Sequence, residues 1–488
     1  MNIQGKEQGT KNIIFKDTFF YLMGAVAPIV IGIVRSPIYT RHFSTEDFGL
    51  YSLAFLFFGY ISIICYTWII NCGWRYYYQY KQKGRSKALF SNLVFLFLLF
   101  SILILVFSFC WYTMVDSPLL KRLILLCFLQ FFTSEIVNLF LIPLRLEGGA
   151  FSYNIIQVIR SVAGFLLLLI LTFVFDYGIE SFLTSVIFLN VALIAVVVVP
   201  YAIKMKLSFS RVSKKDLINL VGYGQIGLIA NLCMALLVSS DRFVIERYTG
   251  VAEVGIYNQN YNIAQITIAA LVHVYWAALD PILLKTLEFQ PDSETTKKRL
   301  SQAFNIWLLF FLPLTVYFVL YAREIAIIML GKEFRIGYPV IFLAAVAEFV
   351  KGWGRLSEER LKFGNKVRLI SITYISAVLC SIGLNIFFVP LFGYPAAGVT
   401  AIVINFLAAF VFGYAVHRNY PAMTIFKDGL FRISVIILAI QVIIHCFTSP
   451  LKMPLYFYIL EGGVFALSYF WLILKNKRFS LKLAEDKE

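Results

Sequence analysis

Residues 89–113 form one unbroken apolar segment without a charged side chain. This length fits the roughly 20 apolar residues that a helix needs to cross about 30 Å of hydrocarbon. Similar segments recur along the chain, in which 60% of the 488 residues are hydrophobic and only 14% are charged. One soluble core cannot bury so much apolar surface. Because backbone polar groups must be paired inside a bilayer, the sequence predicts an all-helical, polytopic membrane protein.

The apolar segments predict about fourteen spans. The first is expected to begin near Phe19 as an uncleaved helix. The other predicted spans cover residues 48–72, 89–113, 121–144, 151–175, 181–203, 217–240, 254–284, 300–320, 337–357, 368–390, 396–417, 429–448 and 453–474. Most of the 43 Lys and Arg residues fall in the tails and in the loops after even-numbered spans. Since cytoplasmic loops collect these residues, both termini are predicted to be cytoplasmic.

The formal net charge of +16 is explained by these loops and their contact with anionic lipid, so no nucleic-acid partner is expected. The seven cysteines show no CxxC spacing, and the four histidines show no metal-binding pattern. Neither a cofactor nor a metal site is therefore predicted.

Two stretches about half the chain apart resemble each other. They are Arg35–Tyr51 (RSPIYTRHFSTEDFGLY) and Asp241–Tyr257 (DRFVIERYTGVAEVGIY), in which Arg41, Asp47, Gly49 and Tyr51 align with Arg247, Glu253, Gly255 and Tyr257. A weaker echo relates FDYGIES (175–181) to FGYPAAG (392–398). Such repeats in a membrane chain are typical of transporters.

The repeat also predicts the domain organisation. Spans 1 and 2 match spans 7 and 8, an even number of crossings later, so the two halves should share one topology and be related by a parallel repeat. We expect an N-terminal lobe of helices 1–6 (residues 1–205) and a C-terminal lobe of helices 7–12 (residues 206–420). Helices 13–14 and a cytoplasmic tail (residues 421–488) fall outside the repeat.

Three motifs resemble the Wzx-type polysaccharide (O-antigen) flippases of the multidrug, oligosaccharidyl-lipid and polysaccharide (MOP) exporter superfamily. They are RSPIYTRHFSTEDFGLYS, DRFVIERYTGVAEVGIYNQNYNIA and FVPLFGYPAAGVTA. The resemblance implies two six-helix lobes around a central cavity and no enzymatic chemistry. It also implies translocation of a polyprenyl-pyrophosphate-linked glycan from the cytoplasmic to the outer leaflet of a bacterial inner membrane. The implied partners are that glycan, membrane lipid and the polysaccharide polymerase machinery.

A pyrophosphate cargo needs cations that keep their charge at low dielectric, and arginine also offers a forked contact to phosphate. Arg35, near the outer part of span 1, and Arg160, inside span 5, are the first candidates for substrate binding. Arg242 is a further candidate phosphate contact. Gln259 and Asn262 are candidates for hydrogen bonds to sugar hydroxyls. The alternative for Arg35 and Arg160 is that each snorkels to a membrane interface.

Acidic residues suggest gating and ion coupling. Arg35 aligns with Asp241 in the repeat, so we hypothesise that the two pair across the outer mouth when it closes. Alternatively, Asp241 and Arg242 merely end span 7. Glu135, close to Asn138 in span 4, and Glu348 in span 10 are candidates for coupling to a proton or Na⁺. Polar residues within spans also hold helices together, which is the alternative for both glutamates.

Three other functions stay open at this point. A multidrug exporter of the same superfamily would be expected to present acids where this chain has Arg35. A membrane-embedded glycan polymerase or glycosyltransferase usually needs a large outer loop or an acidic catalytic motif, and neither is evident. A purely structural membrane protein would not explain charges inside spans together with a repeat.

Overall fold

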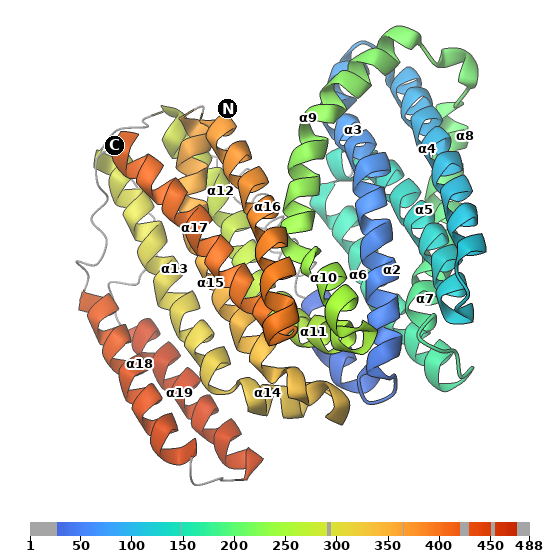
Figure 1. Ribbon diagram of the computed structural model, residues 1–488. Helices are drawn as coiled ribbons and strands as arrows, with labels where there is room; N and C mark the ends of the chain where they lie inside the picture. The colour runs from blue at the N-terminus through green and yellow to red at the C-terminus, as the bar shows by residue number, and fades with distance from the viewer. Residues whose placement is uncertain are drawn as a thin grey trace. The chain divides into compact units, whose positions relative to one another are not determined.

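The computed structural model describes residues 27–147, 149–289, 294–364, 366–419, 429–449 and 454–475 (Figure 1). The predicted N-terminal tail, the start of the first span and the cytoplasmic C-terminal tail lie outside these residues. The described part of the chain contains helices and no strand, which confirms the predicted all-helical class.

The first described helix covers Ala27–Tyr39. The α-helices that follow in the first half are α2 (Thr45–Ser62), α3 (Trp68–Gln82), α4 (Ser86–Met114), α5 (Pro118–Glu147), α6 (Gly149–Phe173), α7 (Ser181–Leu193), α8 (Val199–Met205), α9 (Lys214–Ser239) and α10 (Asp241–Thr249). The later ones are α11 (Val251–Ala264), α12 (Ala270–Phe289), α13 (Glu294–Leu320), α14 (Ala322–Met329), α15 (Tyr338–Phe363), α16 (Val367–Phe392), α17 (Pro395–Asn419), α18 (Gly429–Thr448) and α19 (Leu455–Lys475).

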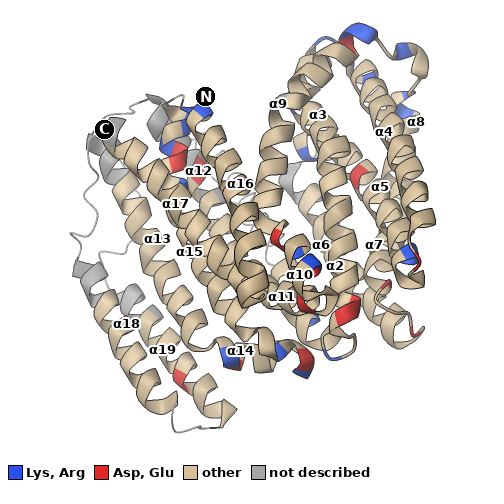
Figure 2. Ribbon diagram, viewed as in Figure 1, with Lys and Arg blue, Asp and Glu red and all other residues tan. Residues whose placement is uncertain are grey.

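Nine helices within the described residues are long and apolar enough to cross a membrane, and three shorter helices are also apolar. Most of the length of α4 and α17 carries no charged residue, and Figure 2 shows charges gathered mainly near helix ends. The protein is therefore a multi-pass membrane protein. The exact number of fourteen spans stays a prediction, since the helices over residues 251–289 and 338–363 are more polar.

Contacts divide the chain into two compact units. The first contains residues 1–259 and 374–397, and the second contains residues 260–373 and 398–488. In the second unit, α18 and α19 lie next to α13 and bury an apolar cluster of Leu309, Leu438, Phe465 and Tyr469 (Figure 1). The predicted boundaries at residues 205 and 420 follow the repeat rather than contacts, and they stay a prediction.

Both repeated motifs place an acidic residue at the start of a helix. Ser44 forms a capping box at the start of α2, in which its hydroxyl accepts from the Asp47 amide and its own amide donates to the Asp47 carboxylate. The aligned position before α11 is Gly250, with φ of 110°. The Glu253 carboxylate lies beside this glycine. The acid shared by the two motifs thus lies at the N-terminus of a helix, where negative charge is favourable.

The glycines shared by the motifs lie where α2 and α11 cross. A Cβ on Gly49 would lie 2.0 Å from the carbonyl oxygen of Val251, and a Cβ on Gly255 would lie 1.9 Å from that of Thr45. Thr45 and Val251 are the first residues of α2 and α11, so each glycine faces the start of the other helix. Only glycine allows the backbones to approach so closely.

A hydrogen bond continues this symmetric contact. Asn258 Nδ2 donates to Ser52 Oγ at 2.9 Å, and the two residues are 206 positions apart. The same spacing separates the two helix starts and the two glycines. The motif positions aligned from sequence are thus also paired in space.

The weaker echo has a matching backbone geometry. Asp176, which follows α6, has φ of 51°, and Gly393, which follows α16, has φ of 73°. The two residues align in FDYGIES and FGYPAAG, and each lies in the left-handed conformation that often follows the C-terminus of a helix. The similar sequences therefore correspond to the same left-handed backbone conformation after the end of a helix.

Candidate functional site

Arg160 is the centre of a polar network inside the first unit. Its guanidinium donates to Asn190 Oδ1 on α7 at 2.9 Å and to Asn138 Oδ1 on α5 at 3.4 Å. Asn190 is fully buried and donates to Ser134 Oγ at 2.8 Å. Three helices therefore fix the guanidinium in one orientation.

Glu135 belongs to the same network. Its carboxylate accepts from Asn138 Nδ2 at 3.1 Å and from Ser62 Oγ on α2 at 3.0 Å. Asn138 therefore lies between the two charges, accepting from Arg160 and donating to Glu135. The structure joins two residues that the sequence proposed for separate roles.

These partners leave Arg160 able to exchange ligands. It is held by two neutral amide oxygens, whereas a phosphate would add a negative charge and a second oxygen for a forked contact. A phosphate oxygen that replaced an amide would strengthen the contact. The carboxylate of Glu135 lies one amide away, so the network as a whole carries both signs of charge.

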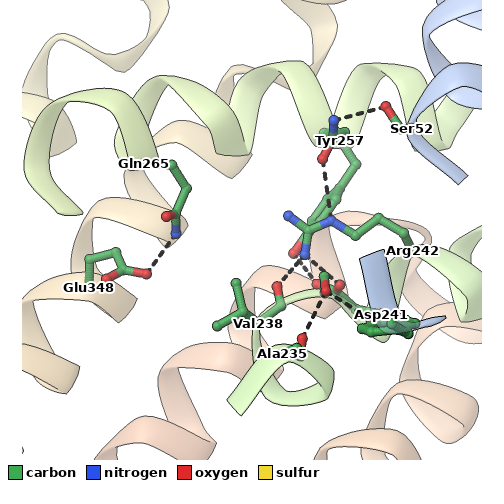
Figure 3. Close-up of polar contacts among 11 residues, drawn as sticks. Ser52, Ala235, Val238, Asp241, Arg242, Tyr257, Gln265 and Glu348 are labelled. Atoms are coloured by element: carbon green, nitrogen blue, oxygen red, sulfur yellow. Dashed lines mark hydrogen bonds and ion pairs between the residues drawn. The ribbon is translucent and has the colours of Figure 1, made fainter. Parts of the chain in front are cut away.

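Asp241 and Arg242 pair with each other in a second buried cluster (Figure 3). Arg242 Nη1 lies 2.7 Å from Asp241 Oδ1, and Tyr257 donates its hydroxyl hydrogen to Asp241 Oδ2 at 2.5 Å. The guanidinium carbon of Arg242 lies 5.1 Å from the centre of the Tyr257 ring. Arg242 Nε also donates to Asn258 at 3.4 Å, which links the cluster to the α2/α11 crossing.

The candidate acid of the second unit is Glu348 on α15. It is only 4% exposed, and it accepts from Gln265 Nε2 at 2.8 Å (Figure 3). Lys351 Nζ lies 3.4 Å from its second carboxylate oxygen. Glu348 is thus held by a polar residue of the eighth predicted span and by a cation on its own helix.

Further charges continue along α15. Arg355 pairs with Asp280 on α12 at 3.0 Å and lies over the Trp276 ring at 5.5 Å. Lys362, beyond the predicted span, contacts two carboxylates, those of Glu358 and Glu359. Burial lowers the pKa of Lys362, but the two carboxylates outweigh it and the net pKa is raised.

The two glutamates occupy comparable places in the repeat. Each lies on the fourth predicted span of its half and accepts a hydrogen bond from the second predicted span of that half. In both second spans this donor adjoins a π-helical turn: Ser62 precedes Ile63–Thr67, and Gln265 begins Gln265–Ala269. Such turns are rare and often mark functional sites.

The remaining predicted residues lie apart from these networks. Arg35 lies over the Phe182 ring of α7, with 5.4 Å between its guanidinium carbon and the ring centre. Gln259 is buried and Asn262 half-buried, both on α11. Their predicted roles, and the pairing of Arg35 with Asp241, stay predictions. No group of three or more His, Cys, Asp or Glu within the described residues is arranged to hold a metal.

Sequence reasoning missed Asn190, Lys351 and Arg355. Asn190 is an ordinary polar residue in an apolar segment until the fold brings it to Arg160. Lys351 and Arg355 are visible as cations four residues apart within the predicted span 337–357. That spacing places them on one helix face and was the available signal.

The helices, the repeat and the charges inside spans define a polytopic helical membrane protein built from two related halves. A family model described as "Polysaccharide biosynthesis protein" matches residues 14–287, more than half of the chain. The chain belongs to this polysaccharide biosynthesis protein family. A search of curated protein sequences finds no match.

Two solved structures show the same fold. A structure of the lipid II flippase MurJ in an inward closed conformation is 13% identical, with a TM-score of 0.70, and the match covers 94% of this chain and 98% of MurJ. An inward-facing multidrug resistance MATE family transporter of the MOP superfamily is 14% identical, with a TM-score of 0.61, and the match covers 81% and 94%. These likenesses show that the chain has the fold expected for the predicted MOP superfamily, and the Wzx branch stays a prediction.

Proposed function

We propose that the protein is a flippase that moves a polyprenyl-pyrophosphate-linked oligosaccharide from the cytoplasmic to the outer leaflet of a bacterial inner membrane. It would do so by alternating access, with both termini cytoplasmic, in the synthesis of a cell-surface polysaccharide. Membrane lipid surrounds the polyprenyl tail, and the polysaccharide polymerase machinery receives the glycan. Membership of the polysaccharide biosynthesis family supports this proposal.

The observation that carries the proposal is the environment of Arg160. An arginine within a span is costly and normally faces water, a ligand or a charged partner. Here its two hydrogen-bond acceptors are amides, Asn138 and Asn190. A pyrophosphate can replace these neutral acceptors without breaking a direct ion pair. At Arg242, by contrast, a phosphate would compete with the Asp241 carboxylate.

The test is transport of a fluorescent polyprenyl-pyrophosphate oligosaccharide in liposomes that contain the purified protein. Wild-type protein should move the lipid across the bilayer. Arg160→Gln should slow transport about tenfold or more, because a hydrogen bond to a charged group contributes about 1.5–3 kcal/mol. Arg247→Gln is the matched control, since Arg247 is exposed at the end of α10.

The same liposomes distinguish the multidrug alternative. Export of a cationic dye by wild-type protein, without transport of any glycan offered, would replace the flippase proposal by a multidrug exporter. Glycan transport that is equally fast in Arg160→Gln and in the Arg247→Gln control would keep the flippase but remove Arg160 from the substrate path.

A further inference from the structure

The C-terminal hairpin of α18 and α19 contains a buried cluster that neither the repeat nor the proposed substrate path uses. Glu461 is the one acidic residue in the described residues of these two helices. Its carboxylate accepts from the Tyr321 hydroxyl at 2.9 Å, from Thr448 Oγ1 at 3.1 Å and from Gln441 Nε2 at 3.4 Å. Tyr321 lies between α13 and α14, so the carboxylate ties the hairpin to the rest of the second unit.

These three donors are neutral, and none of them balances the charge of the carboxylate. Its side chain is 8% exposed, and an ionised carboxylate at such a place is costly without a compensating positive charge. Hydrogen bonds alone satisfy its lone pairs. Avoiding a buried net charge therefore takes either a proton on the carboxyl group or a nearby group that can carry a positive charge.

His445 on α18 is that group. Its Nδ1 lies 3.6 Å from Glu461 Oε1, and its side chain is 12% exposed. Within the described residues Nδ1 has no hydrogen-bond partner at normal distance. The imidazole ring also packs against the rings of Tyr321 and Tyr458, with centroid distances of 4.7 and 6.0 Å. The ring is therefore held beside the carboxylate by contacts that do not depend on its charge.

Other titratable groups on the neighbouring elements do not supply the positive charge. Tyr317 on α13 and Tyr458 on α19 are phenols, which never carry a positive charge. At the start of α14, Glu324 is itself acidic, and Arg323 is exposed. Cys446, next to His445, is an exposed thiol. Among the described residues of these elements, only a proton, on the imidazole or on the carboxyl group, can make the buried pair neutral overall.

We propose that Glu461 and His445 form a proton-binding site that anchors the α18–α19 hairpin to the end of α13. With one proton bound, the pair carries no net charge and the hairpin is held. As pH rises and that proton is lost, a net negative charge stays buried and the hairpin loosens.

The rest of the hairpin contact is independent of pH, which makes the site testable. Tyr469 donates to the Leu309 carbonyl at 2.8 Å, and Gly462 packs against the Tyr317 ring. These contacts and the apolar cluster should keep the hairpin folded in variants of the proton site. A change in its dynamics with pH can then be assigned to Glu461 and His445.

The experiment is hydrogen–deuterium exchange of the full-length protein in nanodiscs between pH 5.5 and 8.5, corrected for the intrinsic exchange rate. In wild-type protein, α18 and α19 should exchange about tenfold faster at the alkaline end. The free energy of opening the hairpin decreases when the proton bound in the closed state is lost. Glu461→Gln keeps a carbonyl acceptor but removes the charge, so its exchange should not change with pH. His273→Gln, at an exposed histidine on α12, is the matched control and should behave like wild type.

Exchange of the wild-type hairpin that is constant with pH would overturn the proposal without any variant. So would a pH dependence that persists in both Glu461→Gln and His445→Gln. Loss of the pH dependence in these two variants, but not in His273→Gln, would establish the proton site. Neither result depends on which substrate the protein carries, so the outcome is separate from that of the flippase test.

Discussion

Asp241 shows how much a single residue's partner matters. In the structure its carboxylate binds Arg242 and the Tyr257 hydroxyl, and its side chain is 10% exposed. The sequence hypothesis pairs it instead with Arg35 when the outer mouth closes. The two pairings predict different effects of mutation. A buried structural pair with Arg242 contributes to stability, whereas a gate with Arg35 contributes to transport.

A double-mutant cycle separates these two roles. Asp241→Asn should destabilise the protein by about 3–5 kcal/mol, because it leaves the Arg242 charge buried without its carboxylate. Adding Arg242→Gln should recover part of that loss, measured as the melting temperature in detergent. Arg35→Gln should cost less, about 0.5–1 kcal/mol, since it loses only the cation–π contact with the Phe182 ring.

The gate hypothesis needs its own readout. Exchanging the charges of Arg35 and Asp241 together should restore the glycan transport that each single reversal loses. A double reversal that transports no better than the single ones, in protein that is still folded, would remove the gate.

At the scale of elements, the crossing of α2 and α11 is the most constrained contact in the first unit. Each glycine faces a backbone carbonyl, which cannot rotate away as a side chain can. The crossing therefore fixes the distance between the two repeated motifs. It also positions Asn258 to receive Arg242 and to donate to Ser52.

Gly49→Ala and Gly255→Ala should each destabilise the protein by about 1–3 kcal/mol or more, because the added methyl group overlaps a carbonyl oxygen. The control is Gly227→Ala in the interior of α9, where a Cβ meets nothing within 4 Å. Removing a glycine from a helix there should be neutral or stabilising by about 0.5–1 kcal/mol. Thermal unfolding compares the melting temperatures of the three variants. Equal melting temperatures would show that α2 and α11 can move apart without loss of stability.

The sequence predicts where helices lie along the chain better than it predicts which helices contact each other. Long apolar runs define most helices, and the capping residue Ser44 defines where α2 begins. The aligned glycines show that two motifs are related, but not that they touch. The rotation of each helix about its axis decides that contact, and spans that are apolar on all sides carry little information about rotation.

Unknown helix rotation also explains why the network of the candidate site could not be predicted from sequence. Arg160 and Glu135 are recognisable as charges inside spans, but their link through Asn138 depends on how α5 and α6 face each other. The π-helical turn beside Gln265 shifts the faces of the residues that follow, and no sequence signal predicted it. Candidate residues could be named from sequence, whereas the network that joins them required the fold.

At the scale of the whole molecule, direction of transport depends on orientation in the membrane. The end of α8, the loop that follows it and the start of α9 carry five basic residues, Lys204, Lys206, Arg211, Lys214 and Lys215. The loop between α4 and α5 is short and contains Asp116. Basic loops stay in the cytoplasm, so these two loops should lie on opposite sides.

Single cysteines in a cysteine-free variant test this orientation. A membrane-impermeant maleimide added to intact spheroplasts should label Asp116→Cys, and it should label Ser210→Cys only after the membrane is opened. Both positions are exposed, so labelling reports the side of the membrane and not burial. Under the proposed function the flippase loads at the cytoplasmic face, so this pattern would place the basic loop next to the face where an anionic pyrophosphate arrives. The reverse pattern would place the basic loops outside, and it would contradict the predicted topology and the loading side together.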